Sequence, residues 1–364
     1  MKVNNFEWEN RKVLVTGASG FKGSYLSKIL LDLGATVFGT ISKQSDPLSS
    51  YKFLNLDTKI KEVNVDITNQ QELENVINKI QPDIIFHLAA TSLVPVALKN
   101  PLRTFNVNVM GTLNLLESCR RLEICEKIAI ISTDHVFGYV KEEDLPKGGF
   151  TEDHPVHWGG PYDTSKAAME LAVRCYNDTY WKNLPAILIT RCANVFGYGD
   201  VNQRRIIPKL VSKSAKGDPI KKLYDDNGRQ FIHITDVITG YIKAVSLLNK
   251  DKESDICLTP TYHFAIEKYD NTDEPFIRMK ELEKIIANIY KVKIEGVGKN
   301  LAPKENPIQA LNCKRTRKAL RWEPKKEFKM GIKELGEWYT NINNLNGPGW
   351  LIEKSCNEII KNLK

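Results

Sequence analysis

The sequence predicts an α/β fold built on a doubly wound parallel sheet, and three observations lead to that prediction. Short apolar runs alternate with segments of helical spacing through the first half of the chain, which is typical of successive strand–helix units. A glycine-rich turn directly follows the first apolar run, where such folds pass from strand to helix. The chain has 364 residues, of which 42% are hydrophobic, so it can bury the core of one large α/β unit or of two domains.

The expected elements follow one another from the N-terminus. Strands are expected at residues 12–15, 34–40, 62–65, 83–88, 128–132 and 186–191. Helices are expected at 24–33, 70–80 and 106–122 and from residue 161 onward. Beyond residue 193 the periodicity loosens, and loops alternate with helices at 207–215, 237–248 and 279–290. We therefore predict a first domain over 1–192 with its sheet completed by segments near 230–260, a smaller domain over 193–340, and an appended helix over 341–364.

Composition and charge exclude several classes of protein. Charged residues make up 26% of the chain, an ordinary share that argues against extensive disorder. The net charge of +8 would suit an anionic partner, but the basic residues are scattered among acidic ones. We therefore expect no nucleic-acid partner, whereas anionic small molecules stay compatible. The seven cysteines form no CxxC pair and show no metal-ligand spacing, which predicts reduced thiols and no metal site. The sequence shows no signal-peptide pattern and no apolar run of bilayer length, so we expect a cytoplasmic protein without a membrane partner.

The glycine-rich turn has the pattern of a dinucleotide-binding loop. It reads Thr16-Gly17-Ala18-Ser19-Gly20-Phe21-Lys22-Gly23 and opens the first helix. Glycines allow a tight turn and a close backbone approach to a pyrophosphate, whose charge is met by the helix N-terminus. Glycine spacing alone is weak evidence, because an ordinary strand–turn–helix uses the same residues, but the context here is the one that the mechanism requires. The spacing GxxGxxG is the short-chain dehydrogenase variant, so a nicotinamide dinucleotide is expected to contact Gly17, Ser19, Gly20, Phe21, Lys22 and Gly23.

Three further segments are expected to contact that cofactor. The second strand ends in Ser42 and Lys43, without the acidic residue that would grip a ribose 2′-hydroxyl. Lys43 suits a 2′-phosphate or simply faces solvent, so NAD is expected and NADP stays open. Asp66 and Ile67 suit an adenine contact, although Asp66 equally fits the start of the following helix. The fourth strand ends where a bulky side chain would obstruct the cofactor, and the residues there are Leu88, Ala89 and Ala90.

Tyr162 and Lys166 are the candidate redox pair. They are four residues apart on an expected helix and therefore share a face. An ammonium group near a phenol lowers the pKa of the phenol, which lets it act as a general acid or base at neutral pH. The Tyr-x-x-x-Lys pattern is also common as a surface pair, but the upstream dinucleotide loop favours catalysis. Tyr162 would take the proton from a substrate hydroxyl while hydride passes from carbon to nicotinamide.

The segment Ser132-Thr133-Asp134-His135 stands at the carboxyl end of a buried strand, where α/β sheets place their ligands. Thr133 is placed to hydrogen-bond the same reacting oxygen as Tyr162. Asp134 and His135 are two titratable groups that a pure oxidoreductase does not need. Elimination of water, in contrast, requires an acid for the leaving group and a base for a carbon acid. The structural alternative is that Asp134 caps a turn and His135 faces solvent.

Together these motifs resemble the extended short-chain dehydrogenase/reductase family that acts on nucleotide sugars, most closely its CDP-glucose 4,6-dehydratases. The resemblance covers essentially the whole chain. Its more discriminating matches are Phe21-Lys22 and Asn108-Val109-Met110-Gly111-Thr112. It implies a Rossmann-type doubly wound parallel sheet with a smaller C-terminal substrate-binding domain. It also implies a homodimer formed through the helices at 106–122 and from residue 162 onward.

The resemblance implies a role for individual residues. Tyr162 and Lys166 would be the redox base and its partner, and Thr133 would orient the sugar. Asp134 would protonate the departing 6-hydroxyl. His135 departs from the family, which usually has glutamate or lysine there, but imidazole has a suitable pKa to remove the C5 proton. Asn108 would belong to the cofactor site, and the arginines of the substrate side suit a diphosphate; that side would comprise Thr91, Ser92, Asn194, Arg205, Arg229 and His233.

We therefore predict a 4,6-dehydratase that converts a nucleoside-diphosphate hexose, CDP-glucose being the nearest model, to the 4-keto-6-deoxy sugar. Oxidation at C4 acidifies the C5 proton, water leaves across C5–C6, and hydride returns to C6, so the cofactor stays tightly bound and is recycled. Deoxysugar supply for a surface polysaccharide is the corresponding hypothesis for its pathway. The segment from Gly228 to His233 lacks the Pro-Trp that CDP-glucose dehydratases carry after the arginine, which leaves base and sugar less defined than the chemistry.

Two rival functions stay open. An epimerase or a 4-keto reductase of the same family would use Tyr162 and Lys166 without needing Asp134 as an acid. A catalytically idle nucleotide-sugar-binding protein would have the same fold. The intact glycine loop and the Tyr162–Lys166 pair argue against the idle protein, because simple binding has no physical need for all of them.

Overall fold

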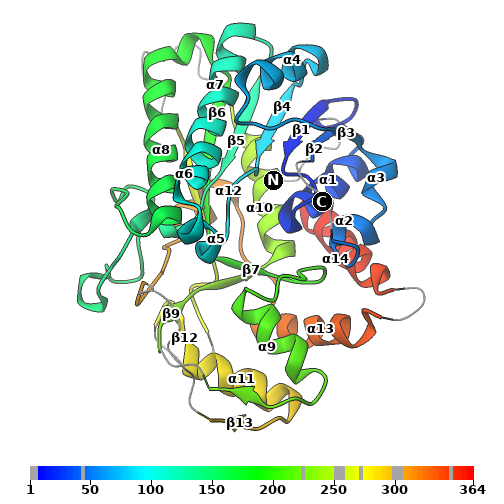
Figure 1. Ribbon diagram of the computed structural model, residues 1–364, viewed down its shortest axis with the longest axis vertical. Coiled ribbons are helices and arrows are strands. Elements are labelled where there is room, and N and C mark those ends of the chain that lie inside the picture. Colours follow the sequence, from blue (N-terminus) through cyan, green and yellow to red (C-terminus); the bar gives the residue numbers. More distant parts are fainter. Residues whose placement is uncertain are drawn as a thin grey trace.

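The centre of the molecule is a parallel sheet of seven strands with helices on both faces (Figure 1). The computed structural model describes residues 7–41, 46–222, 226–249, 259–269, 274–296, 306–343 and 347–364. The strands lie in the order β11-β6-β5-β4-β1-β2-β3, and each neighbouring pair is parallel. Their bounds are β1 (Lys12–Thr16), β2 (Thr36–Thr40), β3 (Lys61–Val63), β4 (Ile84–His87), β5 (Lys127–Ile131), β6 (Ala186–Cys192) and β11 (Thr261–Phe264). The predicted α/β doubly wound fold is confirmed.

The central strands carry apolar side chains on both faces because helices cover both faces of the sheet. In β5, Ile128 and Ile130 face one core, and Ala129 and Ile131 face the other. The first core contains the inner sides of α4 (Gln70–Ile80), α7 (Gly111–Leu122) and α8 (Pro161–Tyr180). The second contains those of α1 (Phe21–Asp32) and α10 (Ile234–Leu247). The last helix, α14 (Gly349–Leu363), packs on α1 and α10.

Shorter helical segments complete the first part of the chain. The expected helix over 106–122 starts with a π turn, η2 (Asn106–Met110), which continues directly into α7. This wide turn places the buried side chain of Asn108 against Thr91 and Ser165. The remaining segments are α2 (Ser50–Phe53), α3 (Leu56–Lys59), α5 (Val94–Lys99), α6 (Pro101–Phe105), η3 (Asp134–Phe137), η4 (Glu142–Asp144), η5 (Trp181–Asn183) and α12 (Lys314–Leu320).

A smaller part of the chain lies beyond the main sheet, at the lower end of the molecule in Figure 1. It consists of α9 (Ile206–Ser214), α11 (Met279–Tyr290) and α13 (Phe328–Asn341) with three two-stranded sheets. The strand pairs are β7 (Asn194–Phe196) with β10 (Phe231–His233), β9 (Gly228–Arg229) with β12 (Ile277–Arg278), and β8 (Ile220–Lys221) with β13 (Ile294–Glu295). Of the later segments expected to complete the main sheet, β11 does so beside β6, whereas β10 pairs with β7 outside it.

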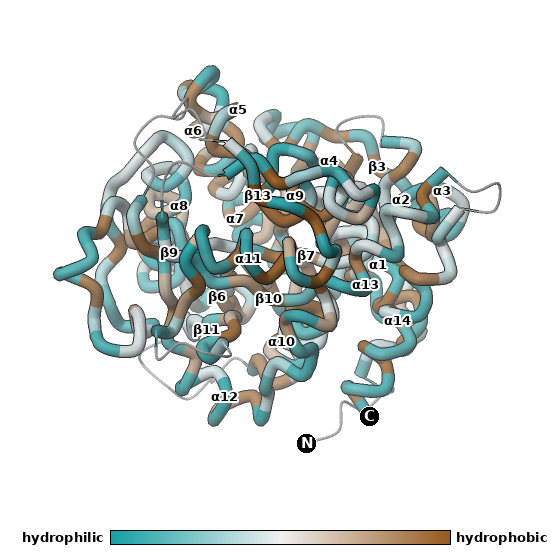
Figure 2. The backbone as a smooth tube through the Cα atoms, turned by 90° about the horizontal axis from the view of Figure 1, so that it is seen from below, coloured by the Kyte–Doolittle hydropathy of each residue, from teal (hydrophilic) through white to brown (hydrophobic). Residues whose placement is uncertain are grey.

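Hydrophobic and hydrophilic residues are interspersed along the helices, as Figure 2 shows for α14. The buried residues of α14 recur at helical spacing along one side, at Leu351, Ile352, Ser355, Cys356, Ile359 and Leu363. Such a helix covers the core on one side and meets solvent on the other. Within the described ranges, no helix combines the length and the apolar character needed to cross a bilayer.

Candidate active site

A cavity of about 1910 Å³ lies at the carboxyl ends of β1, β4, β5 and β6. Its opposite wall comes from the smaller part, through residues of β7, α9 and β9. Doubly wound sheets bind ligands at this edge, next to the point where the strand order reverses. Single small-molecule sites measure roughly 300–1,000 Å³. The cavity therefore has room for a dinucleotide and a second nucleotide together.

The glycine loop is packed so closely that its backbone forms one wall of the cavity. Gly17 has a φ of +71°, and a Cβ there would lie 3.1 Å from the backbone nitrogen of Ala89. A Cβ on Gly23 would lie 2.3 Å from the carbonyl oxygen of Gly17. The helix α1 begins after Gly20 without a side-chain cap, so the N–H groups of its first turn are available to an anion. These features fit the pyrophosphate of a dinucleotide.

Most residues expected to hold the cofactor line this cavity: Gly17, Ser19, Gly20, Phe21, Lys22, Gly23, Asp66, Ile67, Leu88, Ala89, Ala90, Tyr162 and Lys166. Asp66 is compatible with both interpretations that the sequence left open. It lines the cavity, and its Oδ1 accepts from the backbone nitrogen of Thr68 at 3.0 Å in the turn before α4. Asn108 does not line the cavity but supports it from behind, because its Oδ1 accepts from the backbone nitrogen of Thr91 at 2.7 Å. Ser42 and Lys43 lie outside the described residues.

Tyr162 and Lys166 both line the cavity, but they are not joined to each other. The Nζ of Lys166 donates to the carbonyl oxygen of Ile131 at 2.8 Å, and its pKa is lowered to about 7 by burial and by the charge of Lys22. Burial raises the pKa of Tyr162 above the ordinary value, although the neighbouring Thr133 side chain acts in the opposite direction. The expectation that Lys166 lowers the pKa of Tyr162 is therefore not met here, because the ammonium group is directed to the backbone of β5.

Asp134 is a buried carboxyl group with one unused oxygen. Its Oδ1 accepts from the Thr133 hydroxyl at 3.0 Å, while its Oδ2 has no hydrogen-bond partner among the described residues. Burial raises the pKa of Asp134 against the opposing charge of His135. A carboxyl group whose pKa is raised in this way can hold a proton and donate it. Asp134 opens the short helix η3, but it is buried and faces the cavity.

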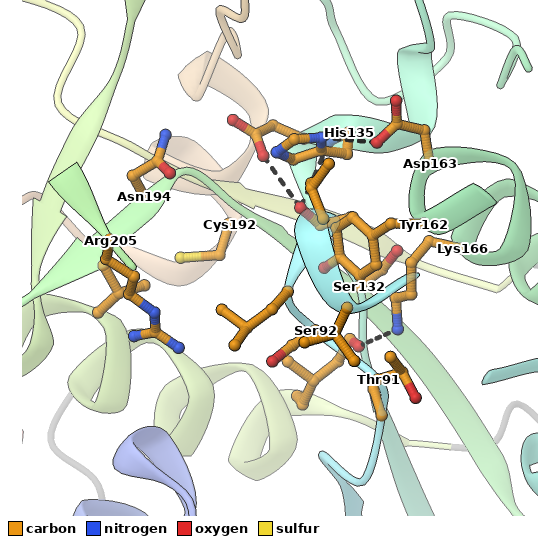
Figure 3. Close-up of a pocket in the computed structure, with 18 of the residues that line it drawn as sticks. Thr91, Ser92, Ser132, His135, Tyr162, Asp163, Lys166, Cys192, Asn194 and Arg205 are labelled. Carbon is orange, nitrogen blue, oxygen red and sulfur yellow. Dashed lines mark hydrogen bonds and ion pairs between the residues drawn. The ribbon is translucent and has the colours of Figure 1, made fainter. Parts of the chain in front are cut away.

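His135 is held by an acidic residue that the sequence analysis missed. Its Nδ1 lies 2.7 Å from Oδ1 of Asp163, and its ring meets that of Tyr162 edge to face at 5.3 Å between centroids. Figure 3 shows His135, Asp163, Tyr162 and Lys166 on one side of the cavity. Asp163 follows Tyr162 directly in the sequence, which was the available signal. The structural alternative of a solvent-facing histidine does not hold, because only 21% of this side chain is exposed.

The expected substrate residues divide into those that line the cavity and one that does not. Thr91, Ser92, Asn194, Arg205 and Arg229 line it. Asn194 donates through Nδ2 to the carbonyl oxygen of Gln230 at 3.2 Å, and Arg205 donates to Asp200 at 3.0 Å. Figure 3 places Asn194 and Arg205 across the cavity from Tyr162.

His233 is the exception, and its expected contact with substrate is a misassignment. The side chain is buried, and its Nδ1 accepts from the backbone nitrogen of Thr235, so it caps α10. Its ring packs edge to face on Phe196. Burial lowers the pKa of His233 to about 3, which keeps the ring neutral. Histidine is not a standard helix cap in sequence patterns. For this reason the sequence pattern predicts a start of α10 that is three residues too late.

Two other residues of the cavity were not singled out from the sequence. Cys192 ends β6, and Figure 3 shows its side chain on the wall opposite Tyr162. The carboxyl-end rule for parallel strands could have found it. Trp158 lines the cavity with 76% of its surface exposed, and nothing in its local sequence signals that position. In the part of the chain that the structure describes, no three His, Cys, Asp or Glu side chains gather as metal ligands.

In comparison with known proteins, this chain is similar to nucleotide-sugar 4,6-dehydratases. The family model for GDP-mannose 4,6 dehydratase matches residues 14–335. A CDP-glucose 4,6-dehydratase of Salmonella typhimurium is 25% identical over 91% of this chain and 91% of its own length. A dTDP-glucose 4,6-dehydratase of Haemophilus influenzae is 27% identical over 90% of this chain and 97% of its own. The resemblance expected from the motifs is confirmed.

Solved structures show the same fold at lower identity. A UDP-glucose 4-epimerase of Thermotoga maritima superposes with a TM-score of 0.75 and is 22% identical, covering 90% of this chain and 98% of its own. A dTDP-glucose 4,6-dehydratase of Streptomyces venezuelae, solved with NAD bound, also has a TM-score of 0.75, with 24% identity over 90% of this chain and 97% of its own. At this level of identity the likeness establishes the fold.

Proposed function

The chain belongs to the GDP-mannose 4,6 dehydratase family, and on that basis we propose that it is a nucleotide-sugar 4,6-dehydratase. The observation that carries the proposal is Asp134, a buried carboxyl group that lines the cavity with Tyr162 and His135 and whose Oδ2 has no hydrogen-bond partner among the described residues. Oxidation and reduction alone would not require this acid. Elimination of water requires both an acid and a base next to the redox tyrosine.

The proposed cofactor is NAD. The uncapped start of α1 and the closely packed loop at Gly17 and Gly23 fit a pyrophosphate, and solved relatives of this fold contain NAD. When bound, the nicotinamide supplies reversible hydride acceptance for oxidation at C4 and reduction at C6. All other steps fall to side chains of this chain.

Tyr162 is proposed to accept the proton of the C4 hydroxyl, and Thr133 is proposed to hydrogen-bond the same oxygen. Thr133 donates to Asp134 and lines the cavity with Tyr162, so it is placed to hydrogen-bond the sugar hydroxyl beside Tyr162. Tyr162 must release its proton to act as a base, but burial raises its pKa. We infer that Lys166 must leave the carbonyl oxygen of Ile131 and approach Tyr162 for this step, because a nearby cation favours the phenolate.

Asp134 and His135 are proposed to carry out the elimination. His135 removes the C5 proton, which the C4 carbonyl group has acidified, and Asp134 gives its proton to the departing 6-hydroxyl. The raised pKa of Asp134, caused chiefly by burial, favours the protonated form that this step needs. The two groups are neighbours in η3, and we propose that His135 acts at C5 while Asp134 protonates the hydroxyl oxygen on the adjacent C6, which departs as water.

The substrate is proposed to be a nucleoside-diphosphate hexose of the CDP-glucose type. The cavity wall opposite Tyr162 holds Arg205 and Arg229, whose guanidinium groups suit the diphosphate. Two of the relatives matched over nine-tenths of the chain are named as dehydratases of CDP-glucose and of dTDP-glucose. These two nucleotides therefore come first in the choice of assay.

The test is to incubate the purified protein with CDP-, GDP-, UDP- and dTDP-hexoses and a catalytic amount of NAD or NADP. Loss of one water from one substrate, without stoichiometric reduction of the cofactor, is the expected result, and Tyr162→Phe should abolish it. A new isomer of unchanged mass would favour an epimerase, and a cofactor-coupled gain or loss of hydrogen would favour a reductase or dehydrogenase. Either outcome would overturn the dehydratase.

The epimerase is the second candidate because relatives of similar coverage include a CDP-paratose 2-epimerase of Salmonella typhi at 24% identity. Epimerisation through a keto intermediate uses a redox tyrosine but no leaving-group acid. Replacing Asp134 by asparagine therefore separates the two functions, since an epimerase would keep most of its activity.

We also propose a homodimer formed through α7 and α8. These helices pack side by side, and their outer surface exposes Leu171 to 57% and the adjoining Met110 to 47%. Exposed apolar side chains on neighbouring helices are typical of an interface. Light scattering in solution should give twice the chain mass of 41.4 kDa. A monomer at micromolar concentration would contradict this proposal.

A further inference from the structure

Asp163 binds His135 in a geometry that leaves one ring nitrogen for chemistry. His135 belongs to η3 after β5, whereas Asp163 lies in the first turn of α8, so the contact joins two separate elements. The Nδ1–Oδ1 distance is 2.7 Å, in the range of a charge-assisted hydrogen bond. Only 11% of the Asp163 side chain is exposed, so solvent competes little for the carboxylate. No hydrogen bond engages Nε2 of His135 in the described part of the chain.

The hydrogen bond determines which tautomer of His135 is present. An ionised carboxylate can only accept hydrogen bonds, so the ring must present N–H at Nδ1. Nε2 of the neutral ring then carries a lone pair. Because His135 lines the cavity, this lone pair is available to a proton on a bound sugar. The other tautomer would place N–H at Nε2 and could not act as a base there.

The loop before α8 is shaped around the Asp163 carboxylate. The second carboxylate oxygen, Oδ2, accepts from the backbone nitrogen of Gly160 at 3.1 Å. The hydroxyl of Thr164 fixes the same loop through both the nitrogen and the oxygen of Gly159. A Cβ on Gly159 would lie 2.5 Å from Oδ2 and 3.0 Å from the Cβ of Asp163. Glycine at this position therefore leaves the space that the carboxylate occupies.

The charges around His135 favour its protonated form. Burial lowers its pKa, but the hydrogen bond that Nδ1 donates to Asp163 and the negative charge of Asp163, joined by that of Asp134 whenever Asp134 is ionised, outweigh burial, and Arg229 acts against them. The net pKa is above the ordinary 6.5. A stronger base with a fixed tautomer is what removal of a proton from carbon requires.

We propose that Asp163 is the positioning residue of a His135–Asp163 dyad, which holds Nε2 of His135 as the base that removes the C5 proton. The inference rests on the proposed dehydratase function for its chemistry, whereas the dyad itself is a property of the protein alone. The dyad gives the imidazole the fixed tautomer that a base at this place in the cavity needs.

The first experiment needs no substrate. Nitrogen-detected NMR of the imidazole rings, with His135→Gln to assign the signal among the six histidines, reports tautomer and pKa directly. In the wild type we expect the Nδ1–H tautomer and a pKa above 6.5. Asp163→Asn should lower this pKa and mix the tautomers. Gly159→Ala should do the same without removing any charged group, because its methyl displaces the carboxylate. An unchanged tautomer and pKa in both variants would overturn the dyad.

The second experiment measures elimination against pH. Only the neutral ring accepts a proton, so the wild-type rate should fall as pH drops through the pKa of His135. In Asp163→Asn the acid limb should move to lower pH, while the plateau falls at least about 10-fold because the base is weaker and its tautomer is no longer fixed. A variant with a merely structural defect would lose rate without moving the limb, and this result would refute the proposal.

The matched control is Asp178→Asn, an exposed carboxylate on the same helix. It should leave the pH profile unchanged.

The two proposals fail in different ways. If the wild type releases no water from any substrate, the proposed function fails while the NMR result still stands or falls independently. If the wild type dehydrates its substrate and Asp163→Asn has the same tautomer, pKa and acid limb, only the dyad fails.

Discussion

Replacing Asp134 by asparagine should stop elimination while it leaves the fold and the first oxidation intact. The two side chains have nearly the same shape, and asparagine Oδ1 can still accept from Thr133, as Asp134 Oδ1 does at 3.0 Å. The amide nitrogen would replace Oδ2, which has no hydrogen-bond partner among the described residues. No existing contact is therefore lost, and only the transferable proton disappears.

The expected loss of activity follows from the role of the acid. General acid catalysis contributes about 10²- to 10⁴-fold, which corresponds to roughly 3 to 5 kcal/mol of transition-state stabilisation. Because oxidation at C4 does not use Asp134 as an acid, the absorbance of reduced cofactor should build up in a single turnover while release of water slows. Rapid-mixing absorbance and quenched mass spectrometry measure the two steps separately.

The same variant should gain stability at neutral pH. Burial raises the folded-state pKa of Asp134 above its unfolded value, so between the two values the folded state binds more protons. Stability therefore falls as pH rises through this window, and asparagine removes that cost. A gain of about 1 kcal/mol would raise the melting temperature by roughly 1 °C for a chain of this size. Wild-type rates of water release, or a clearly lower melting temperature, would refute the assignment of Asp134 as a buried, protonated acid.

Three further outcomes test other parts of the structure. Gly23→Ala places a methyl 2.3 Å from the Gly17 carbonyl oxygen and should cost about 1–3 kcal/mol of stability and weaken cofactor binding, as urea unfolding and calorimetric titration would show. Glu170→Gln breaks the fully buried pair in which Glu170 Oε2 lies 2.7 Å from Arg191 Nη2, and it should cost about 3–5 kcal/mol in urea unfolding. Burial and the charge of Lys166 lower the pKa of His87 to about 3, so the unfolded state binds more protons between pH 3 and 6.5 and stability is lost as pH falls through that window. His87→Gln should flatten this pH dependence of the unfolding free energy, and an unchanged slope would contradict a neutral buried His87.

Local patterns predicted the elements well where each element has its own periodic signal. The helix α4 spans Gln70–Ile80 as expected, and Asn69 caps it by accepting from the backbone nitrogen of Glu72. The helix α11 also has its expected bounds, Met279–Tyr290. The start of α10 differs, because this helix begins at Ile234 under a cap from the side chain of His233, a residue type that is not a standard helix cap.

The candidate site was predictable in its residue types but not in its pairings. The strand-end rule and the glycine loop predicted that Thr133, Asp134, His135 and Tyr162 lie at one site. All four line the cavity. The direction of Lys166, in contrast, depends on the carbonyl oxygen of Ile131, which lies on another element. Sequence spacing shows that two residues share a helix face but not which acceptor a long side chain finds.

The sequence by itself determined the order of strands and helices, the cofactor loop and the chemical groups at the strand ends, because these depend on neighbours within a few residues along the chain. Only the tertiary structure decided that Asp163 holds His135 and that His233 lies in the core. Asp163 and His135 are separated by 28 residues, and their contact exists only because η3 and α8 pack together. Contacts of this kind depend on the packing of whole elements, which a local pattern of residues does not specify.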